Sequence, residues 1–237
     1  MMNEQFKLPP RLALIASFVP DGAHLADVGT DHGLLPIRLL LDGKIQAAVA
    51  TDIRPGPLSR AQENAEMLAV NGLRCVLCDG LSDVSPDDVD TVAIAGMGGE
   101  NITAILRNAP WACEHALLIL QPMSRPEELR TAFRSLGLRV QKEQLVRDNG
   151  RVYSVMAVSA GEPEKYSCGE LYCGKYSLLS SDALFSEFLE EQERHLQAAV
   201  QGLERSSKDS DGQRLDMLRS AVTDIQNMRR KCHAERA

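Results

Sequence analysis

Acidic side chains stand at the ends of three successive apolar segments in the first third of the chain. Asp27 lies in the first segment and opens the run Asp27–Gly33, which reads DVGTDHG. Asp52 closes the second segment, and Asp79 closes the third. Because the carboxyl ends of parallel strands meet at one edge of an open sheet, we expect these acids to surround a single cleft.

The run Asp27–Gly33 differs from a phosphate-binding loop. A dinucleotide fingerprint needs the spacing G-x-G-x-x-G so that the backbone approaches a pyrophosphate, whereas this run holds two acids and one histidine. Carboxylates favour a cationic ligand, such as one that carries an ammonium and a sulfonium group, and Gly29 leaves room for backbone contact. A nicotinamide-dependent oxidoreductase is therefore the least favoured enzyme class.

The two later acids predict an adenosine moiety in the same ligand. An acid in the position of Asp52 accepts hydrogen bonds from ribose hydroxyls. A carboxylate at Asp79 accepts one from an adenine amino group, although each acid alone could also be a solvated strand-end residue. An adenosyl group without phosphates and with a cationic side chain describes S-adenosylmethionine (SAM), and no metal ion is expected. The predicted cofactor-binding residues are Asp27, Gly29, Thr30, Asp31, His32, Asp52, Asp79, Gly80, Gly96 and Met97.

Glycines crowd the segment Ala95–Gly99, which reads AGMGG and follows a fourth apolar segment. Three glycines in four positions predict that the backbone approaches bound molecules closely, here substrate and methyl donor together. The alternative is a flexible turn before a helix that begins near Asn101. After a fifth apolar segment, Gln121 and Pro122 add an amide and a rigid turn beside the same cleft.

Strand and helix patterns alternate over the first 136 residues, which predicts a parallel sheet covered by helices. An opening helix carries Leu12, Ile15, Ala16 and Val19 on one face. Further helices are predicted over Pro57–Val70 and Pro126–Leu136. The predicted strands are His24–Val28, Ala47–Thr51, Arg74–Cys78, Thr91–Ala95 and Ala116–Leu120.

The last two predicted strands, Leu138–Val146 and Val152–Ser159, form a hairpin. Asp148-Asn149-Gly150 between them is a strong turn signal, so these strands should run antiparallel to one another. Five parallel strands closed by an antiparallel hairpin are expected of an α/β Rossmann-like class I methyltransferase sheet. We place this SAM-binding domain at residues 1–160.

A second unit, residues 161–237, is predicted to be a linker followed by a small α-helical, coiled-coil-like hairpin. The linker covers 161–176, and Ser206–Gly212 interrupts the helical pattern. We expect the apolar stripe of the two helices to be satisfied within the pair. The helices could instead dimerise the protein or brace the main domain. The stripe contains Phe185, Leu189, Leu196, Ala199, Leu203, Leu215, Leu218, Val222 and Ile225.

Composition limits the partners and the location. A hydrophobic content of 44% supplies a full core, and a formal net charge of -7 means that any nucleic acid is held by local patches. Charged residues and two prolines near the start argue against a signal peptide, so we expect a cytoplasmic protein without membrane contact. We further expect a monomer or weak homodimer. The pair Cys75 and Cys78 resembles half a zinc site, but a buried strand is the favoured interpretation because Cys168 and Cys173 have the wrong spacing.

The chain resembles the bacterial tRNA (adenine-22 N1)-methyltransferase family, TrmK, over nearly its full length. The resemblance implies a Rossmann-like domain, a helical C-terminal domain, SAM as methyl donor and tRNA as substrate. Leu34 and Met123 depart from the family pattern, in which a tyrosine and an asparagine are common and would face the target base. The matching motifs are Asp27-x-Gly29-Thr30-Asp31-His32, Leu35-Pro36, Gly56-Pro57, Asp79-Gly80-Leu81, Ile94–Gly99 and Leu120-Gln121-Pro122.

The implied reaction needs no strong base, because adenine N1 attacks the methyl group with its own lone pair. Asp31 would accept a hydrogen bond from the exocyclic amine, with His32 or Gln121 orienting it, so these three are the candidate catalytic residues. Alternatives are methylation of another RNA nucleotide, a small molecule or a protein, and a non-catalytic module that binds SAM or adenosine. Candidate RNA contacts, which could also be an ordinary solvated face, are Arg125, Arg130, Arg134, Arg229, Arg230, Lys231 and Arg236.

Overall fold

A seven-stranded mixed sheet forms the centre of the computed structural model, which describes residues 7–205 and 212–236. The strand order is β3-β2-β1-β4-β5-β7-β6. Strands β1 to β5 are parallel, and β7 runs antiparallel between β5 and β6. The predicted Rossmann-like methyltransferase sheet with its closing hairpin is therefore confirmed. The strands are β1 (His24–Val28), β2 (Ala47–Asp52), β3 (Leu73–Leu77), β4 (Thr91–Gly98), β5 (Leu117–Ser124), β6 (Leu138–Asp148) and β7 (Arg151–Ala160).

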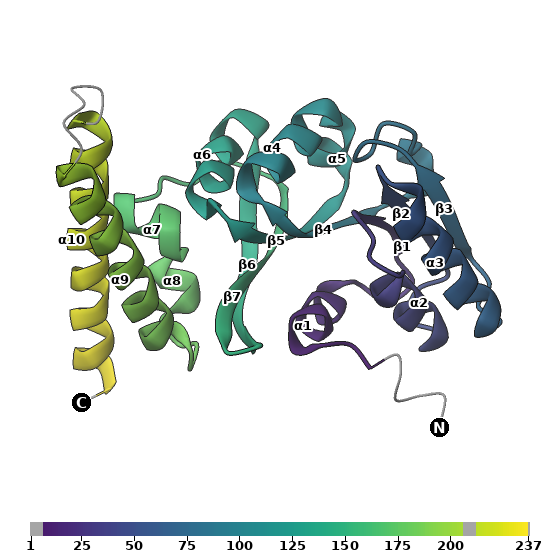
Figure 1. Ribbon diagram of the computed structural model, residues 1–237, viewed down its shortest axis with the longest axis horizontal. Coiled ribbons are helices and arrows are strands. Elements are labelled where there is room, and N and C mark those ends of the chain that lie inside the picture. The colour runs from purple at the N-terminus through teal and green to yellow at the C-terminus, as the bar shows by residue number, and fades with distance from the viewer. Residues whose placement is uncertain (1–6, 206–211, 237) are drawn as a thin grey trace.

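Helices cover both faces of this sheet (Figure 1). One face carries α1 (Pro10–Phe18), α2 (Leu34–Leu41) and α3 (Pro55–Met67). The other carries α4 (Gly99–Asn108), α5 (Pro110–His115) and α6 (Pro126–Leu136), and a short 3-10 helix, η1 (Pro86–Asp88), precedes β4. Each face has its own apolar core, which explains why the central strands are apolar on both sides.

Two details of the strands differ from the prediction. The sheet places β3 at its edge, so this strand is only partly buried and Leu77 is 56% exposed, whereas a short buried strand was expected. The glycine-rich segment after Ala95 is not a separate loop, because β4 continues through it to Gly98. Irregular pairing with β5 at Met97 and Gly98 lets a strand contain these glycines.

The expected linker over 161–176 is wrong in part, because α7 (Cys168–Cys173) and the start of α8 (Tyr176–Leu179) lie within it. A capping box begins α7: Glu170 N donates to Ser167 Oγ, and the Glu170 carboxylate accepts from Ser167 N. This pattern, a serine followed three residues later by glutamate, is a sequence signal that the linker interpretation overlooked.

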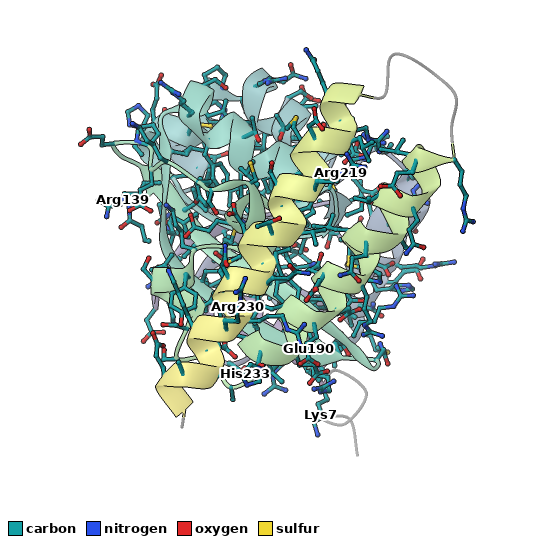
Figure 2. The ribbon with its side chains drawn as sticks, turned by 90° about the vertical axis from the view of Figure 1, so that its left-hand side faces the viewer. Lys7, Arg139, Glu190, Arg219, Arg230 and His233 are labelled. Atoms are coloured by element: carbon teal, nitrogen blue, oxygen red, sulfur yellow. The ribbon has the colours of Figure 1, made fainter. Side chains whose placement is uncertain are left out.

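The predicted helical pair is present as α9 (Phe185–Glu204) and α10 (Gly212–Arg236), which run side by side (Figure 2). The expected break at Ser206–Gly212 falls almost entirely outside the described residues. The apolar stripe is not satisfied within the pair alone. Leu145 of β6 and Val152 of β7 belong to the same core cluster as Phe188 and Leu189 of α9, so the helices are packed onto the closing hairpin.

Candidate active site

A cavity of about 650 Å³ opens at the carboxyl ends of β1, β2, β3 and β4, where an open α/β sheet places its ligand. We call it the sheet-edge cavity. Ile53, Arg54 and Asn101 also line it, together with residues at the ends of the strands and on α4. The structure thus brings together the following predicted cofactor residues: Gly29, Asp52, Asp79, Gly80, Gly96 and Met97.

Gly29 shapes the wall of this cavity through its backbone. Its φ is +73°, and a Cβ at this position would lie 2.1 Å from Cε of Met97. The amides of Gly29 and Thr30 both donate to the carbonyl of Thr51, at 2.8 and 2.9 Å. The turn after β1 is therefore anchored to the end of β2, and a side chain at position 29 would displace Met97.

Asp27 is buried directly before the residues that line the cavity and does not line it itself. Thr30 Oγ1 donates to Asp27 Oδ2 at 2.6 Å. Burial raises the pKa of Asp27 to about 6, and the hydrogen bond from Thr30, which acts in the opposite direction, offsets only part of this shift. A negative charge at Asp27 is thus unfavourable in its buried environment, and a nearby cation would favour it.

Asp52 is buried at the end of β2 and faces the cavity. Its Oδ1 accepts from the amide of Arg54 at 2.8 Å, while Oδ2 accepts no hydrogen bond from any described residue. The neighbouring Ile53 is 67% exposed and lines the cavity, which provides an apolar surface beside the acid. Ile53 was not among the predicted site residues, although an isolated apolar residue directly after a strand-end acid was a signal for it.

Asp31 and His32 lie outside the cavity lining, on the loop between β1 and α2. The Asp31 side chain is 81% exposed, and its Oδ1 lies 3.2 Å from Nε2 of His32. The two side chains therefore meet each other at the surface, two residues beyond Gly29. Leu34, expected to face the target base, instead packs partly against a cluster formed by Ile37 and Ala65.

Gln121 is fully buried and does not line the cavity. Its Oε1 accepts from Arg11 Nη1 at 2.7 Å and from the amide of Gly96 at 3.1 Å. Its Nε2 donates to the carbonyl of Pro122 at 2.9 Å. Gln121 thus holds the backbone that forms the cavity wall and is not free to contact a bound molecule. Arg11, 110 residues away, had no signal in the sequence.

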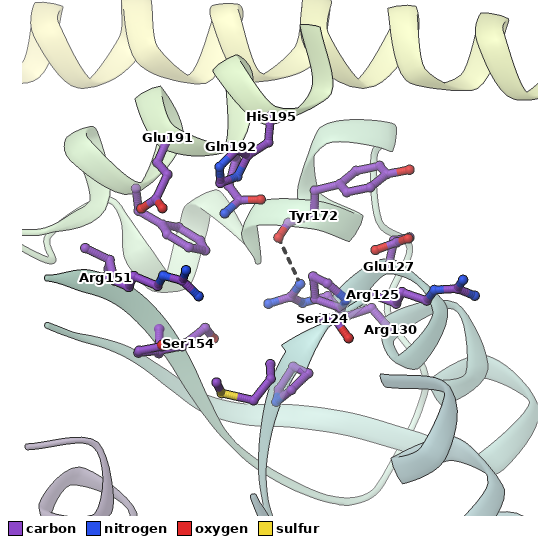
Figure 3. A pocket seen from close by; sticks show the side chains of 16 residues that line it. Ser124, Arg125, Glu127, Arg130, Arg151, Ser154, Tyr172, Glu191, Gln192 and His195 are labelled. Carbon is purple, nitrogen blue, oxygen red and sulfur yellow. Dashed lines mark hydrogen bonds between the residues drawn. The ribbon is translucent and has the colours of Figure 1, made fainter. Parts of the chain in front are cut away.

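A second cavity, of about 460 Å³, lies between the end of β5, strand β7 and α9 (Figure 3). We call it the interdomain cavity. His195 of α9 faces Arg151 and Ser154 of β7 across it, and Met123 also lines it. Arg151 and His195 are exposed and form no ion pair within the described residues, so they are available to a ligand.

Several cations predicted to contact RNA are engaged elsewhere. Arg130 is buried, and its Nη2 donates to Glu143 Oε1 at 2.6 Å. Arg229 forms ion pairs with Glu190 and Glu193 of α9. Lys231 lies 5.6 Å from the ring centre of Tyr176.

The remaining predicted cations differ in their availability. Arg125 pairs with Glu128 at 2.9 Å, and Arg230 donates to Asn227. Arg134 is exposed without an ion pair among the residues that the structure describes, and the side chain of Arg236 lies outside them. The described part of the chain contains no group of three or more metal-ligating side chains and no helix that could cross a membrane.

Comparisons with known proteins agree with this geometry. A family model described as a methyltransferase domain matches residues 8–156. A tRNA (adenine(22)-N(1))-methyltransferase from Bacillus subtilis is 29% identical over 214 residues, which cover 87% of this chain and 89% of the relative. A putative tRNA methyltransferase from Mycoplasma pneumoniae is 30% identical over 153 residues, covering 62% of this chain and 70% of the relative.

A solved structure is also similar. The crystal structure of a putative tRNA (m1A22) methyltransferase from Streptococcus pneumoniae, in complex with S-adenosyl-L-methionine, has a TM-score of 0.79 and 30% identity, covering 92% of this chain and 98% of that one. The resemblance inferred from the motifs is therefore confirmed, and the 92% of this chain that is covered includes at least part of the C-terminal helices.

Proposed function

The chain belongs to the methyltransferase domain family, and from this premise we propose that it transfers a methyl group from SAM to N1 of adenine 22 in tRNA. The observation that carries the proposal is the sheet-edge cavity, in which two strand-end acids and a glycine-rich wall meet at the ends of four strands. The printed activity of the Bacillus subtilis relative supports the substrate, and the SAM complex of the Streptococcus pneumoniae protein supports the donor.

The residues of the cavity fit the proposed donor. The unpartnered Oδ2 of Asp52 is placed to accept from ribose hydroxyls, and Asp79 to accept from the adenine amine. Ile53 offers an apolar surface to the base. When bound, SAM supplies an electrophilic methyl group on a sulfonium. Asp27, Thr30 and the backbone of Gly29 hold the turn that faces its amino-acid part.

The chain's own contribution to transfer is alignment. Gly96 and Met97 form the wall between the donor and the end of β5, where the acceptor would approach. Asp31 is exposed and free to accept a hydrogen bond from the acceptor's exocyclic amine. Its Oδ1 lies next to Nε2 of His32, which orients the carboxylate. Gln121 acts indirectly, by holding the Gly96 amide.

The interdomain cavity is the proposed path of the RNA beside the site. Met97, which lines the sheet-edge cavity, pairs with Pro122, and the next residue, Gly98, pairs with Ser124. Pro122 and Ser124 line the interdomain cavity, so the two cavities flank the same pair of strand ends. Arg151 and His195 supply unpaired donors for phosphate or base groups. Because the chain is acidic overall, local donors such as the guanidinium of Arg151 are expected to carry the RNA contact.

The experiment is to incubate the purified protein with labelled SAM and unmodified tRNA, and to identify the methylated nucleoside by mass spectrometry. We expect 1-methyladenosine, and no label on a matched transcript with guanine at position 22. Label on the guanine transcript would show that another nucleotide is methylated, an alternative motivated by Met123, which lines the interdomain cavity. SAM binding without turnover on tRNA, small molecules or protein would favour a binding module. A cytoplasmic location and a monomeric or weakly dimeric state stay predictions.

A further inference from the structure

A polar connection centred on the buried side chain of Gln121 runs from the opening helix to the wall of the sheet-edge cavity. Arg11 of α1 donates to Gln121 Oε1 at 2.7 Å, and the same oxygen accepts from the Gly96 amide at 3.1 Å. Gln121 is fully buried, and its Nε2 is bound to the carbonyl of Pro122, which fixes the orientation of the amide group. One oxygen atom therefore joins a cation from α1 to the backbone of the glycine-rich wall.

The backbone at Gly96 in the glycine-rich wall is not held by regular strand pairing. Gly96 has φ of +77° and lies where the pairing of β4 with β5 is irregular, so the sheet ladder does not hold this peptide in a regular register. Its amide instead donates to a side chain. A charged donor on the same acceptor holds the Gln121 oxygen in place, so that its second lone pair stays directed at the Gly96 amide.

The guanidinium of Arg11 is itself held on two further sides. Its Nε lies 3.8 Å from Oδ2 of Asp148, at the end of β6. It also lies 5.9 Å from the ring centre of Tyr153, which lines the interdomain cavity. Arg11 thus contacts Tyr153, which lines the interdomain cavity. It also contacts Gln121, which binds the Gly96 amide in the wall of the sheet-edge cavity.

We propose that Arg11 is a positioning residue for methyl transfer, which acts through Gln121 to hold the Gly96 backbone in the geometry that transfer needs. The expected effect on the rate of methyl transfer rests on the proposed function. The expected effect on the Gly96 amide does not depend on the identity of the acceptor. A brace that merely docks α1 would stabilise the fold without affecting Gly96 specifically.

The chain offers a matched control for this distinction. Lys44 Nζ donates to the carbonyl of Ala16 at 2.8 Å, which anchors the other end of α1 to the same domain. Lys44 lies away from the residues that line the sheet-edge cavity. Lys44→Met therefore loosens the docking of α1 and leaves the Arg11–Gln121–Gly96 connection in place.

The first test measures amide hydrogen exchange at Gly96 by NMR, without tRNA. We expect Arg11→Met to speed exchange by about tenfold or more, and Lys44→Met to leave it near the wild-type rate. Arg11→Lys keeps the charge that faces Asp148 but loses the planar donor fork, so an intermediate rate is expected, and this variant replaces Arg11→Met if that one fails to fold. Wild-type exchange in both Arg11 variants, or equal acceleration in Lys44→Met, would overturn the proposal.

The second test is a double-mutant cycle on the single-turnover rate of tRNA methylation. Arg11→Met and Gln121→Leu should each lower the rate by about 10- to 100-fold, with smaller changes in the Kd for S-adenosylhomocysteine and in the KM for tRNA. The double variant should lose little more than either single variant, because both act through one connection. Additive losses would contradict the proposal. A wild-type chain that is inactive on tRNA would refute the proposed function instead, and the Gly96 exchange would still decide the role of Arg11.

Discussion

Asp52 is the residue whose environment ties it most directly to the sheet-edge cavity, because its Oδ2 has no donor among the described residues. We expect Asp52→Asn to weaken SAM binding by about 1.5 to 3 kcal/mol, or roughly 10- to 150-fold, through loss of charge-assisted hydrogen bonds. Calorimetric titration of the purified protein measures this. The matched control is Asp83→Asn, at an exposed acid outside the cavity lining, which should bind normally. Unchanged affinity in Asp52→Asn would remove the ribose assignment.

Asp31 is expected to act on the acceptor and not on the donor, because it is exposed and outside the cavity lining. Asp31→Asn should lower the single-turnover rate of tRNA methylation by on the order of 100-fold, the usual effect of losing one electrostatic contact to the reacting group. Its Kd for S-adenosylhomocysteine should stay within about twofold of the wild-type value. An equal loss of rate and of affinity would assign Asp31 to the donor site.

Asp27 makes the stability of the fold decrease as the pH rises, which is opposite to the usual effect of a carboxylate. Its folded-state pKa of about 6 lies above the ordinary value of 3.8, so the folded state binds the proton more tightly than the unfolded state does. Its contribution to stability is therefore present below about pH 4 and is lost as the pH rises towards 6. The loss is up to about 3 kcal/mol, as an order of magnitude.

Asp27→Asn removes this dependence. The variant without cofactor should unfold at a higher Tm than the wild type at pH 8, and the advantage should disappear near pH 4. SAM affinity of the wild type should rise with pH through about 6, because a cationic ligand favours the ionised acid, while the variant should bind weakly and with little pH dependence. A wild-type affinity that is flat from pH 5 to 8 would show that Asp27 does not sense the ligand's charge.

The contact between helix α6 and the hairpin depends on a buried ion pair. Arg130 donates to Glu143 at 2.6 Å and to the carbonyl of Leu171 in α7 at 2.8 Å, and Ser154 of β7 donates to the same carboxylate at 2.5 Å. Glu143→Leu alone should destabilise the protein by about 3 to 5 kcal/mol, because it leaves a buried guanidinium without its counter-charge. The double variant Arg130→Met with Glu143→Leu should be clearly more stable than Glu143→Leu. Urea unfolding measures both, and a double variant no more stable than Glu143→Leu would argue against a coupled pair.

At the scale of the whole molecule, the C-terminal helices and the sheet share a core. A chain that ends at Ala160 exposes Leu145 and Val152 and removes the carbonyl that accepts from Arg130. We therefore expect a lower Tm and aggregation of this shortened chain, compared with the full chain. Leu145→Ser with Val152→Thr in the shortened chain should restore solubility and SAM binding but not tRNA methylation. Thermal unfolding, light scattering and calorimetry test this, and a shortened chain as stable as the full chain would show two independent domains.

The amino-acid sequence determined most of the elements and the edge at which the site forms. Apolar runs bounded by turn residues locate β1 to β5, the signal at Asp148–Gly150 locates the hairpin, and strand-end acids identify the cavity, because each of these signals lies within one short segment. Parallel topology then brings the strand ends together without further information.

Only the tertiary structure decided which distant residues share an environment. Gln121 was predicted to be a ligand-facing amide, but it is bound by Arg11 from α1. Arg130 and Arg229 were candidate RNA contacts, but each faces a carboxylate on another element. A local pattern reports the type of element and its apolar face, whereas the partner of a polar side chain depends on where the chain returns, which periodicity does not encode.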